Sequence, residues 1–317
     1  MIILKWVKFC LVVGKLCVVH AVFLCDRLAG QKKMEFAFGD LASKAREVEP
    51  PAPLGDFAFG DLSGSSCALV DGPADKKDLF VLTRAMQQQF LDTLAVTEED
   101  VERIMRYEQR TPEWHEARKG RMTGSICGAV VGHNFFKKPA EVLKDLLWNS
   151  FTGNEATKWG TDHEAIAAVR YENHTDYVVD YPGLVINRHK PWIAYSPDGV
   201  VKSNGDSERV LLEIKCPFKK KVYGRIPKYY FDQIQYGAHL MQCPVIDFFV
   251  WTPTICKLER FAYEPAYCEE FLIPTVERFY FRRFLPLYLL QQRGLLAEGS
   301  IDVPKNVKVE AFWPAET

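Results

Sequence analysis

The spacing of apolar residues changes along this chain of 317 residues. Beyond about residue 79, apolar side chains recur every three or four positions, which is typical of amphipathic helices. This spacing predicts helices over 79–94, 98–110, 112–119, 123–131, 139–150 and 158–173. Thr97, followed by three acidic residues, is expected to cap the second helix. In the last helix, Ala165, Ile166 and Val169 are expected to face the core.

Shorter and denser apolar runs follow, and they indicate β-strands. These runs cover 177–180, 183–187, 192–195, 208–215, 245–251 and 255–264, and the third lies in a longer extended segment, 192–201. A helix is predicted over 226–242, and a long amphipathic helix over 265–292, which Pro274 and Pro286 are expected to kink. This order predicts an α/β fold of three layers, with a central mixed β-sheet flanked by helices.

The predicted strand 208–215 carries polar residues that are unusual in an apolar run. Side chains alternate along a strand, so Glu213 and Lys215 share one face and Ile214 takes the other. If the preceding extended run pairs with this strand, the carboxylate of Asp198 can reach the same face. An acid and a lysine on one face make sense if that face lines a metal site.

Phosphodiester hydrolysis is the chemistry that uses such a set. A hard divalent cation prefers carboxylate, water and phosphate oxygens, and it can activate a water molecule. A nearby lysine can orient that water or hold the phosphate. Asp198, Glu213 and Lys215 therefore fit the PD-(D/E)xK nuclease pattern. Taken alone, Pro197-Asp198-Gly199 is also a common turn signal, and an acid and a lysine two positions apart also occur on solvated strands.

The flanking segments differ from the predicted nuclease domain, 81–293. Residues 1–25 are apolar but interrupted by lysines, and they are either a signal or anchor or a simple extension. Residues 26–80 are predicted to be a disordered linker, with a short repeat at 36–42 and 57–63. Residues 294–317 are predicted to be a C-terminal tail.

Composition and charge narrow the class of protein. The chain is 48% hydrophobic and 26% charged, which suits a globular domain with extra sequence attached. Its net charge of −1 means that DNA contact must come from local patches, and the basic stretch 219–228 is either such a patch or a solvated loop. Nine cysteines without a C-x-x-C pair exclude zinc-ribbon and iron–sulfur spacing, and indicate reduced thiols in an intracellular protein. The nucleus is one alternative location.

Four separated segments carry a family resemblance. They are W-x3-R-x-G-x-x-T-x-S from Trp114 to Ser125, W-G-T-D-H-E from Trp159 to Glu164, S-P-D-G with L-E-I-K-C-P from Ser196 to Pro217, and Y-F-D-Q-I-Q-Y from Tyr230 to Tyr236. In this order they resemble the YqaJ-type viral recombinase family, PD-(D/E)xK nucleases related to the bacteriophage lambda exonuclease. The resemblance implies a restriction-endonuclease-like core, which agrees with the predicted three layers.

The resemblance also implies roles for individual residues. The metal ion, Mg²⁺ or alternatively Mn²⁺, would be held by Asp198, Glu213, the Ile214 carbonyl and Glu164. The catalytic site would be completed by Lys215 and Gln233. A terminal 5′-phosphate of DNA would be held by Arg118 and Ser125. Each has a simpler interpretation. Glu164 and Gln233 could be solvated, and Arg118 could pair with Glu113 or Glu116. Trp114 and Trp159 are expected in the core, and His115, His163 and His239 are expected to be structural.

Two functions from different classes follow. The first is a metal-dependent 5′-to-3′ exonuclease on duplex DNA ends in recombination or repair. The resemblance implies a single-strand annealing recombinase as its partner and assembly as a trimer. The second is a non-catalytic DNA-end-binding or assembly protein that keeps the fold. The gap from Asp198 to Glu213 is longer than in the phage enzyme, and the gap from Lys215 to Gln233 is shorter. These differences affect the expected trimer and the loop that would guide the DNA more than they affect the expected hydrolysis.

Overall fold

A computed structural model describes residues 19–24, 79–149, 153–175, 177–202 and 209–312. The predicted linker and its repeat lie outside these residues, apart from the last two linker positions. Among the described residues, no helix is both long and apolar enough to cross a lipid bilayer.

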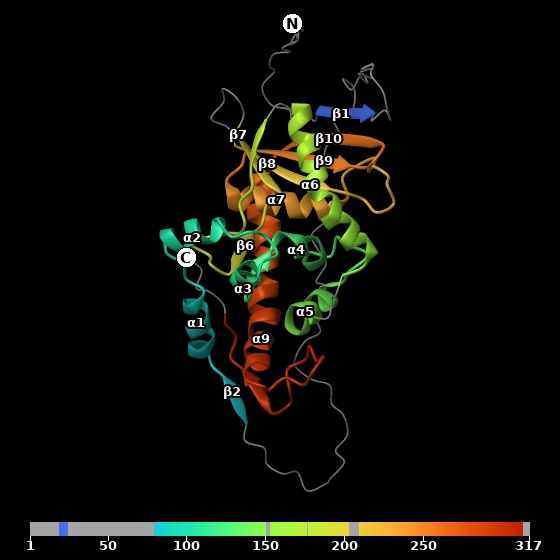
Figure 1. The fold of residues 1–317 in the computed structure, drawn as a ribbon. Helices are drawn as coiled ribbons and strands as arrows, with labels where there is room; N and C mark the ends of the chain where they lie inside the picture. Colours follow the sequence, from blue (N-terminus) through green and yellow to red (C-terminus); the bar gives the residue numbers. More distant parts are fainter. Residues whose placement is uncertain (1–18, 25–78, 150–152, 176, 203–208, 313–317) are drawn as a thin grey trace, which may run out of the picture.

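A six-stranded sheet lies in the upper part of the molecule in the view of Figure 1. Its strand order is β1 (Val19–Leu24), β10 (Ile255–Ala262), β9 (Val245–Trp251), β8 (Arg209–Lys215), β7 (Gly199–Lys202) and β4 (Val178–Asp180). Strands β8 and β9 pair in parallel, and all other neighbours are antiparallel. The predicted α/β class and mixed sheet are therefore confirmed. Residues 19–24 of the apolar N-terminal segment supply the edge strand β1.

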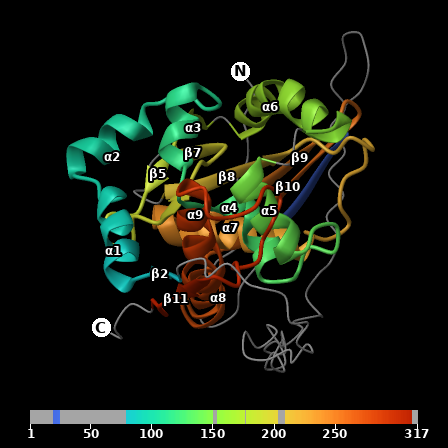
Figure 2. The same cartoon turned by 90° about the horizontal axis from the view of Figure 1, so that it is seen from below.

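Helices cover both faces of this sheet. In Figure 2, strands β8 and β9 lie between α6 (Glu155–Thr175) and α7 (Lys228–Met241). Residues of β8 alternate accordingly: Leu212 packs in one buried cluster with α6, and Leu211 packs in another with α7. This alternation produces the three predicted layers, helix, sheet and helix.

The prediction of which residues of α6 face the core is wrong. Ile166 and Val169 are 53% and 57% exposed, whereas Ala167, Ala168 and Tyr171 are buried. The Tyr171 hydroxyl donates to Asp247 Oδ2 on β9 at 2.6 Å, and this contact fixes the rotation of the helix about its axis. The small alanines allow α6 to approach the sheet closely.

Threonine caps begin the first three helices, which are α1 (Arg84–Thr93), α2 (Glu98–Met105) and α3 (Pro112–Arg118). In each case the preceding threonine accepts a hydrogen bond from a backbone N–H of the first turn. Thr97 forms the predicted cap, and Asp100 completes a capping box. The helix α4 (Gly124–Val130) follows and packs on α7 (Figure 1), and α5 (Pro139–Trp148) comes next.

The long helix predicted over 265–292 is present with two widened turns. These are the π-helical segments η1 (Tyr267–Leu272) and η2 (Tyr280–Phe284), each placed just before a proline-containing segment. Those segments are α8 (Ile273–Phe279) and α9 (Leu285–Gln292), where Pro274 and Pro286 are the second residues. A proline has no N–H to donate, and a widened turn accommodates the missing bond without ending the helix.

Three predicted boundaries are corrected. The first predicted helix begins as a strand, β2 (Phe80–Leu82), before α1. This strand pairs in parallel with β11 (Val307–Val309), so residues 294–312 belong to the fold and are not a tail. The extended run 192–201 divides into β6 (Ile193–Tyr195) and β7, because β6 joins a separate small sheet with β3 (Met122–Thr123) and β5 (Val185–Ile186).

Candidate active site

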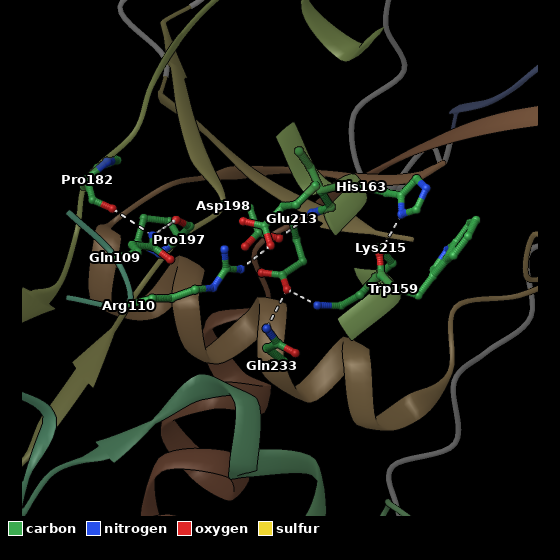
Figure 3. A network of polar contacts seen from close by, with 12 residues as sticks. Gln109, Arg110, Trp159, His163, Pro182, Pro197, Asp198, Glu213, Lys215 and Gln233 are labelled. Atoms are coloured by element: carbon green, nitrogen blue, oxygen red, sulfur yellow. Dashed lines mark hydrogen bonds and ion pairs between the residues drawn. The ribbon is translucent and has the colours of Figure 1, made fainter. Parts of the chain in front are cut away.

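The turn before β7 brings Asp198 to the middle of β8. Strands β7 and β8 pair, as the prediction required, and they run antiparallel with Gly199 opposite Leu212. Asp198 stands immediately before this ladder, and its Oδ2 accepts a hydrogen bond from the Ile214 N–H at 2.7 Å. The predicted proximity of Asp198 to the Glu213–Lys215 strand is therefore found in the structure (Figure 3).

Glu213 is a fully buried carboxylate on the face of β8 that looks toward α7. Its Oε1 accepts hydrogen bonds from Lys215 Nζ and, at 2.5 Å, from Gln233 Nε2 of α7. Its Oε2 accepts from the Tyr195 hydroxyl at 2.6 Å. Gln233 is therefore a contact of the site rather than a solvated amide. Ile214 points to the opposite face, in the cluster beside α6, as the strand alternation predicts.

The charges of the site act strongly on one another. Burial and the neighbouring Glu213 carboxylate raise the pKa of Asp198 well above its usual range, and Glu164 adds to the effect. Burial alone would lower the pKa of Lys215, but Glu213 and Asp198 together outweigh it and raise that pKa. Lys215 is therefore a charged ammonium group held among carboxylates.

Glu164 reaches the site from α6. Its Oε2 lies 2.6 Å from Nη2 of Arg110, whose backbone has a left-handed φ of 72°. The adjacent Gln109 donates from Nε2 to the carbonyls of Pro182 and Pro197, at 3.1 and 2.9 Å. Figure 3 shows Arg110 and Gln109 extending toward the turn that carries Asp198. The segment before α3 thus contacts both the turn that carries Asp198 and the acid on α6.

The donor set suits a hard cation. Asp198 and Glu213 are carboxylates near one another, and Glu164 is close enough to act on Asp198. In this arrangement Glu213 and Glu164 are held by protein donors, and no cluster of three or more His, Cys, Asp or Glu side chains poised to hold a metal occurs within the described residues. The concentration of negative charge around Asp198 nevertheless fits a divalent cation, which would offset the repulsion.

Arg118 lies apart from these carboxylates. Its guanidinium carbon is 4.1 Å from the centre of the buried Trp114 ring, and its nitrogens contact Ser196 Oγ and Thr123 Oγ1, both at 3.3 Å. Burial lowers the pKa of Arg118 to about 10. The alternative that Arg118 pairs with Glu113 or Glu116 is not found among the described ion pairs, where Glu116 contacts Lys119 instead.

Ser125 is exposed on the first turn of α4, two residues after Thr123. The structure therefore places Ser125 and Arg118 at the same end of α4. Among the described residues no hydrogen bond joins these two side chains. A joint role at one phosphate stays a prediction.

Tyr195 and Ser196 are site residues that were not predicted from the sequence. The Tyr195 ring is wedged between two helices, since a Cβ added at Gly124 or Gly237 would lie 2.5 or 2.3 Å from it. Ser196 Oγ accepts from Arg118 and, at 3.0 Å, from Trp114 Nε1, and so links the arginine to the turn that carries Asp198. The available signal was their place directly before Pro197-Asp198-Gly199.

Of the two tryptophans expected in the core, only Trp114 is fully buried, and a structural role for the three histidines stays a prediction. Trp114 is buried, whereas Trp159 is only partly buried and stacks on His163 at a ring distance of 3.7 Å. His163 contacts the Trp159 carbonyl, and His239 contacts the Tyr263 hydroxyl at 2.7 Å. His115 is exposed beside Trp114. Within the described part of the chain, no disulfide joins the five cysteines.

The predicted basic stretch is exposed next to the site. Its cationic side chains are Lys219, Lys220, Lys221, Arg225 and Lys228. Lys220 Nζ lies 4.8 Å from the centre of the Trp159 ring. None of the five forms an ion pair with another described residue, so their charges face solvent.

Comparisons with known proteins agree with the motifs. Residues 113–243 match the family model of the YqaJ-like viral recombinase domain. An uncharacterized protein of Acanthamoeba polyphaga mimivirus is 27% identical over 176 residues, which cover 51% of this chain and 31% of that protein. A protein of African swine fever virus is 28% identical over 159 residues, 42% of this chain and 46% of its own length. The chain thus spans less than half the length of these curated relatives.

Among solved structures, the alkaline exonuclease of Laribacter hongkongensis is similar, with a TM-score of 0.47 and 24% identity, covering 58% of this chain and 97% of that one. A phage-related exonuclease from Haemophilus somnus has a TM-score of 0.40 and 15% identity, covering 55% and 95%. The family match includes Arg118, Ser125, Glu164, Asp198, Glu213, Lys215 and Gln233. The resemblance to YqaJ-type viral recombinases that the four motifs indicated is thereby confirmed for residues 113–243.

Proposed function

We propose that this protein is a metal-dependent deoxyribonuclease, acting as a 5′-to-3′ exonuclease on duplex DNA ends in recombination or repair. One observation carries the proposal: β8 presents Glu213 and Lys215 on one face, with Asp198 held against the same strand by the Ile214 N–H at 2.7 Å. The match of residues 113–243 to a viral recombinase domain supports DNA as the substrate.

Mg²⁺, with Mn²⁺ as an alternative, would be held by the carboxylates of Asp198 and Glu213, the Ile214 carbonyl and Glu164. When bound, such an ion activates water and neutralises charge that builds on the phosphate. Hard oxygen donors are the ligands that both ions prefer.

The remaining residues of the site orient these groups. The Tyr195 hydroxyl and the Gln233 amide fix both oxygens of Glu213, and the Ile214 N–H fixes Asp198. Lys215 carries a positive charge and would hold the attacking water or the scissile phosphate. The orientation of each charged group is thus set by a specific neighbour before DNA arrives.

Arg118 would recognise the terminal 5′-phosphate, with Ser125 as a second donor. Arg118 is charged, partly buried and without a carboxylate partner among the described residues. Its guanidinium is fixed by stacking on Trp114, so little entropy is lost when it binds a phosphate. The basic stretch 219–228 would contact the DNA backbone. Cooperation with a single-strand annealing recombinase and assembly as a trimer are further parts of the proposal.

The test is digestion of end-labelled linear duplex DNA by the full chain, with and without Mg²⁺. Wild-type protein should shorten the 5′-phosphorylated strand only when Mg²⁺ is present, and Lys215→Ala should be inactive while unfolding at a similar temperature. Arg118→Ala should remove the preference for 5′-phosphorylated over unphosphorylated ends, whereas Lys119→Ala, on the exposed neighbour, should keep it. DNA binding without cleavage in Mg²⁺ or Mn²⁺ would favour a non-catalytic end-binding protein instead.

A further inference from the structure

Two adjacent aromatic side chains project into solvent between α4 and α5. Phe135 and Phe136 are 78% and 73% exposed, and their ring centres are 4.1 Å apart. Exposing two large apolar rings side by side is unfavourable in water, and such patches commonly mark binding sites.

The loop that carries these rings is held in place by hydrogen bonds. The N–H groups of His133 and Asn134 both donate to the Gly128 carbonyl, at 2.8 and 2.9 Å, and Asn134 Oδ1 accepts from the Phe136 N–H at 2.9 Å. The His133 ring contacts the buried Asp232 of α7 at 2.9 Å. The exposed pair is therefore presented by an anchored loop.

The pair begins a series of rings that leads to the candidate active site. Phe135 and Phe136 stand edge-on to Tyr229, with ring centres 6.2 and 6.3 Å away. Tyr229 contacts Tyr230 at 4.4 Å, and the Tyr230 ring centre lies 4.9 Å from Lys215 Nζ. The first turn of α7 thus joins the exposed loop to a residue of the proposed catalytic set.

Two exposed lysines flank this series of rings. Lys138 follows the phenylalanines and Lys228 precedes the tyrosines; both are exposed, and neither forms an ion pair with any described residue. Exposed aromatic faces beside unpaired lysines suit single-stranded nucleic acid, because bases stack on the rings and phosphates contact the cations. An apolar protein partner would gain nothing from these charges.

We propose that Phe135, Phe136 and Tyr229 form a stacking platform for unpaired bases of the strand that enters or leaves the active site. This inference rests on the proposed nuclease function for the identity of its ligand. It adds single-stranded DNA to the substrate class and names the residues that bind its bases.

The experiment measures binding of fluorescent oligo(dT), on the order of ten nucleotides long, to the full chain in EDTA, where no cleavage occurs. A strand of the same length without bases is measured in parallel. Phe135→Ala/Phe136→Ala should weaken oligo(dT) binding roughly tenfold, by the usual size of base–aromatic stacking, and should leave the abasic strand unaffected. Ile166→Ala/Val169→Ala, which also removes exposed apolar groups, should change neither affinity.

Equal wild-type affinity for the two strands, or unchanged oligo(dT) binding by the phenylalanine variant, would overturn the inference. Either result would leave Phe135 and Phe136 as a surface for a protein partner. Cleavage of duplex ends, assayed separately with Mg²⁺, distinguishes this failure from that of the proposed function. An inactive protein that still discriminates against the abasic strand loses the nuclease proposal but keeps the platform.

Discussion

At the scale of single residues, the candidate site depends on how Glu213 is held. A buried carboxylate is costly unless donors satisfy it, and Glu213 has donors from three parts of the chain: Lys215 on its own strand, Gln233 on α7 and Tyr195 on β6. Tyr195 alone among these donors is uncharged, fully buried and fixed by packing on both sides. Its hydroxyl therefore sets the orientation of the carboxylate.

Tyr195→Phe tests this positioning role. Removal of the hydroxyl leaves Glu213 Oε2 without its donor, which should cost about 1–3 kcal/mol of unfolding free energy. Under the proposed function, in which Glu213 is a metal ligand, the cleavage rate should fall about 10- to 100-fold, and more Mg²⁺ should be needed for the half-maximal rate. Urea unfolding and a Mg²⁺ titration of the cleavage rate measure the two effects.

Tyr236→Phe is the matched control. Tyr236 is equally buried, but its hydroxyl donates to the Met122 carbonyl at 3.0 Å and does not contact the carboxylates. This variant should lose stability with little change in Mg²⁺ requirement. If both variants lose only stability, Tyr195 has no special role at the site.

The protonation of His239 should make the stability of the fold depend on pH. Burial lowers the pKa of His239 below its ordinary 6.5; nearby Lys190 lowers it further, and Glu269 opposes the shift. The unfolded chain therefore takes up this proton first as the pH falls. The contribution of the neutral imidazole is complete above about pH 6.5 and is lost as the pH falls through the lower, folded value.

His239→Gln removes this titration but keeps a polar partner for the Tyr263 hydroxyl. Between about pH 7.5 and pH 5.5, wild-type protein should lose more unfolding free energy than the variant does. Urea unfolding at several pH values measures the slopes, and the exposed His189→Gln supplies the reference. Parallel slopes for wild type and His239→Gln would contradict the prediction.

At the scale of elements, two helices must approach Tyr195 closely, and both do so through glycine. A Cβ at Gly237 of α7 would lie 2.3 Å from the Tyr195 ring. Gly237→Ala should therefore destabilise the fold by about 1–3 kcal/mol, the usual cost of overpacking a core. Gly160→Ala in α6 meets no atom within 4 Å and should stabilise the helix by up to about 1 kcal/mol. Urea unfolding measures the change in unfolding free energy for each variant. Changes of opposite sign support the packing argument, and changes of the same sign contradict it.

The sequence predicted these elements unevenly, for physical reasons. The shared face of Glu213 and Lys215 on β8 was predictable, because alternation within one strand decides which side chains share a face. The inner face of α6 was not, because it depends on a hydrogen bond from Tyr171 to Asp247, 76 positions away. Likewise Gln109 contacts carbonyls 73 and 88 positions along the chain, so no local pattern reveals its role. Contacts of this kind belong to the fold rather than to any motif.

At the scale of the whole molecule, the two ends of the domain meet. Strand β2 opens the described domain and pairs with β11 near its end. Gln87 Nε2 donates to the Glu310 carbonyl at 2.8 Å, and the Trp148 indole donates to the Ser300 carbonyl at 2.8 Å. Short segments such as β11 carry little periodicity, which is why their sequence alone indicated a tail.

Truncation tests whether this closure stabilises the fold. A chain that ends at residue 293 loses β11 together with the buried side chains of Leu296 and Val307. Burying each such side chain contributes about 1.5–3 kcal/mol, so the truncated chain should lose at least about 3 kcal/mol of unfolding free energy. A chain that ends at Phe312 keeps all of these contacts and should unfold like the full protein. If the two chains unfold at the same urea concentration, the C-terminal segment does not stabilise the domain, and the tail predicted from the sequence describes it better.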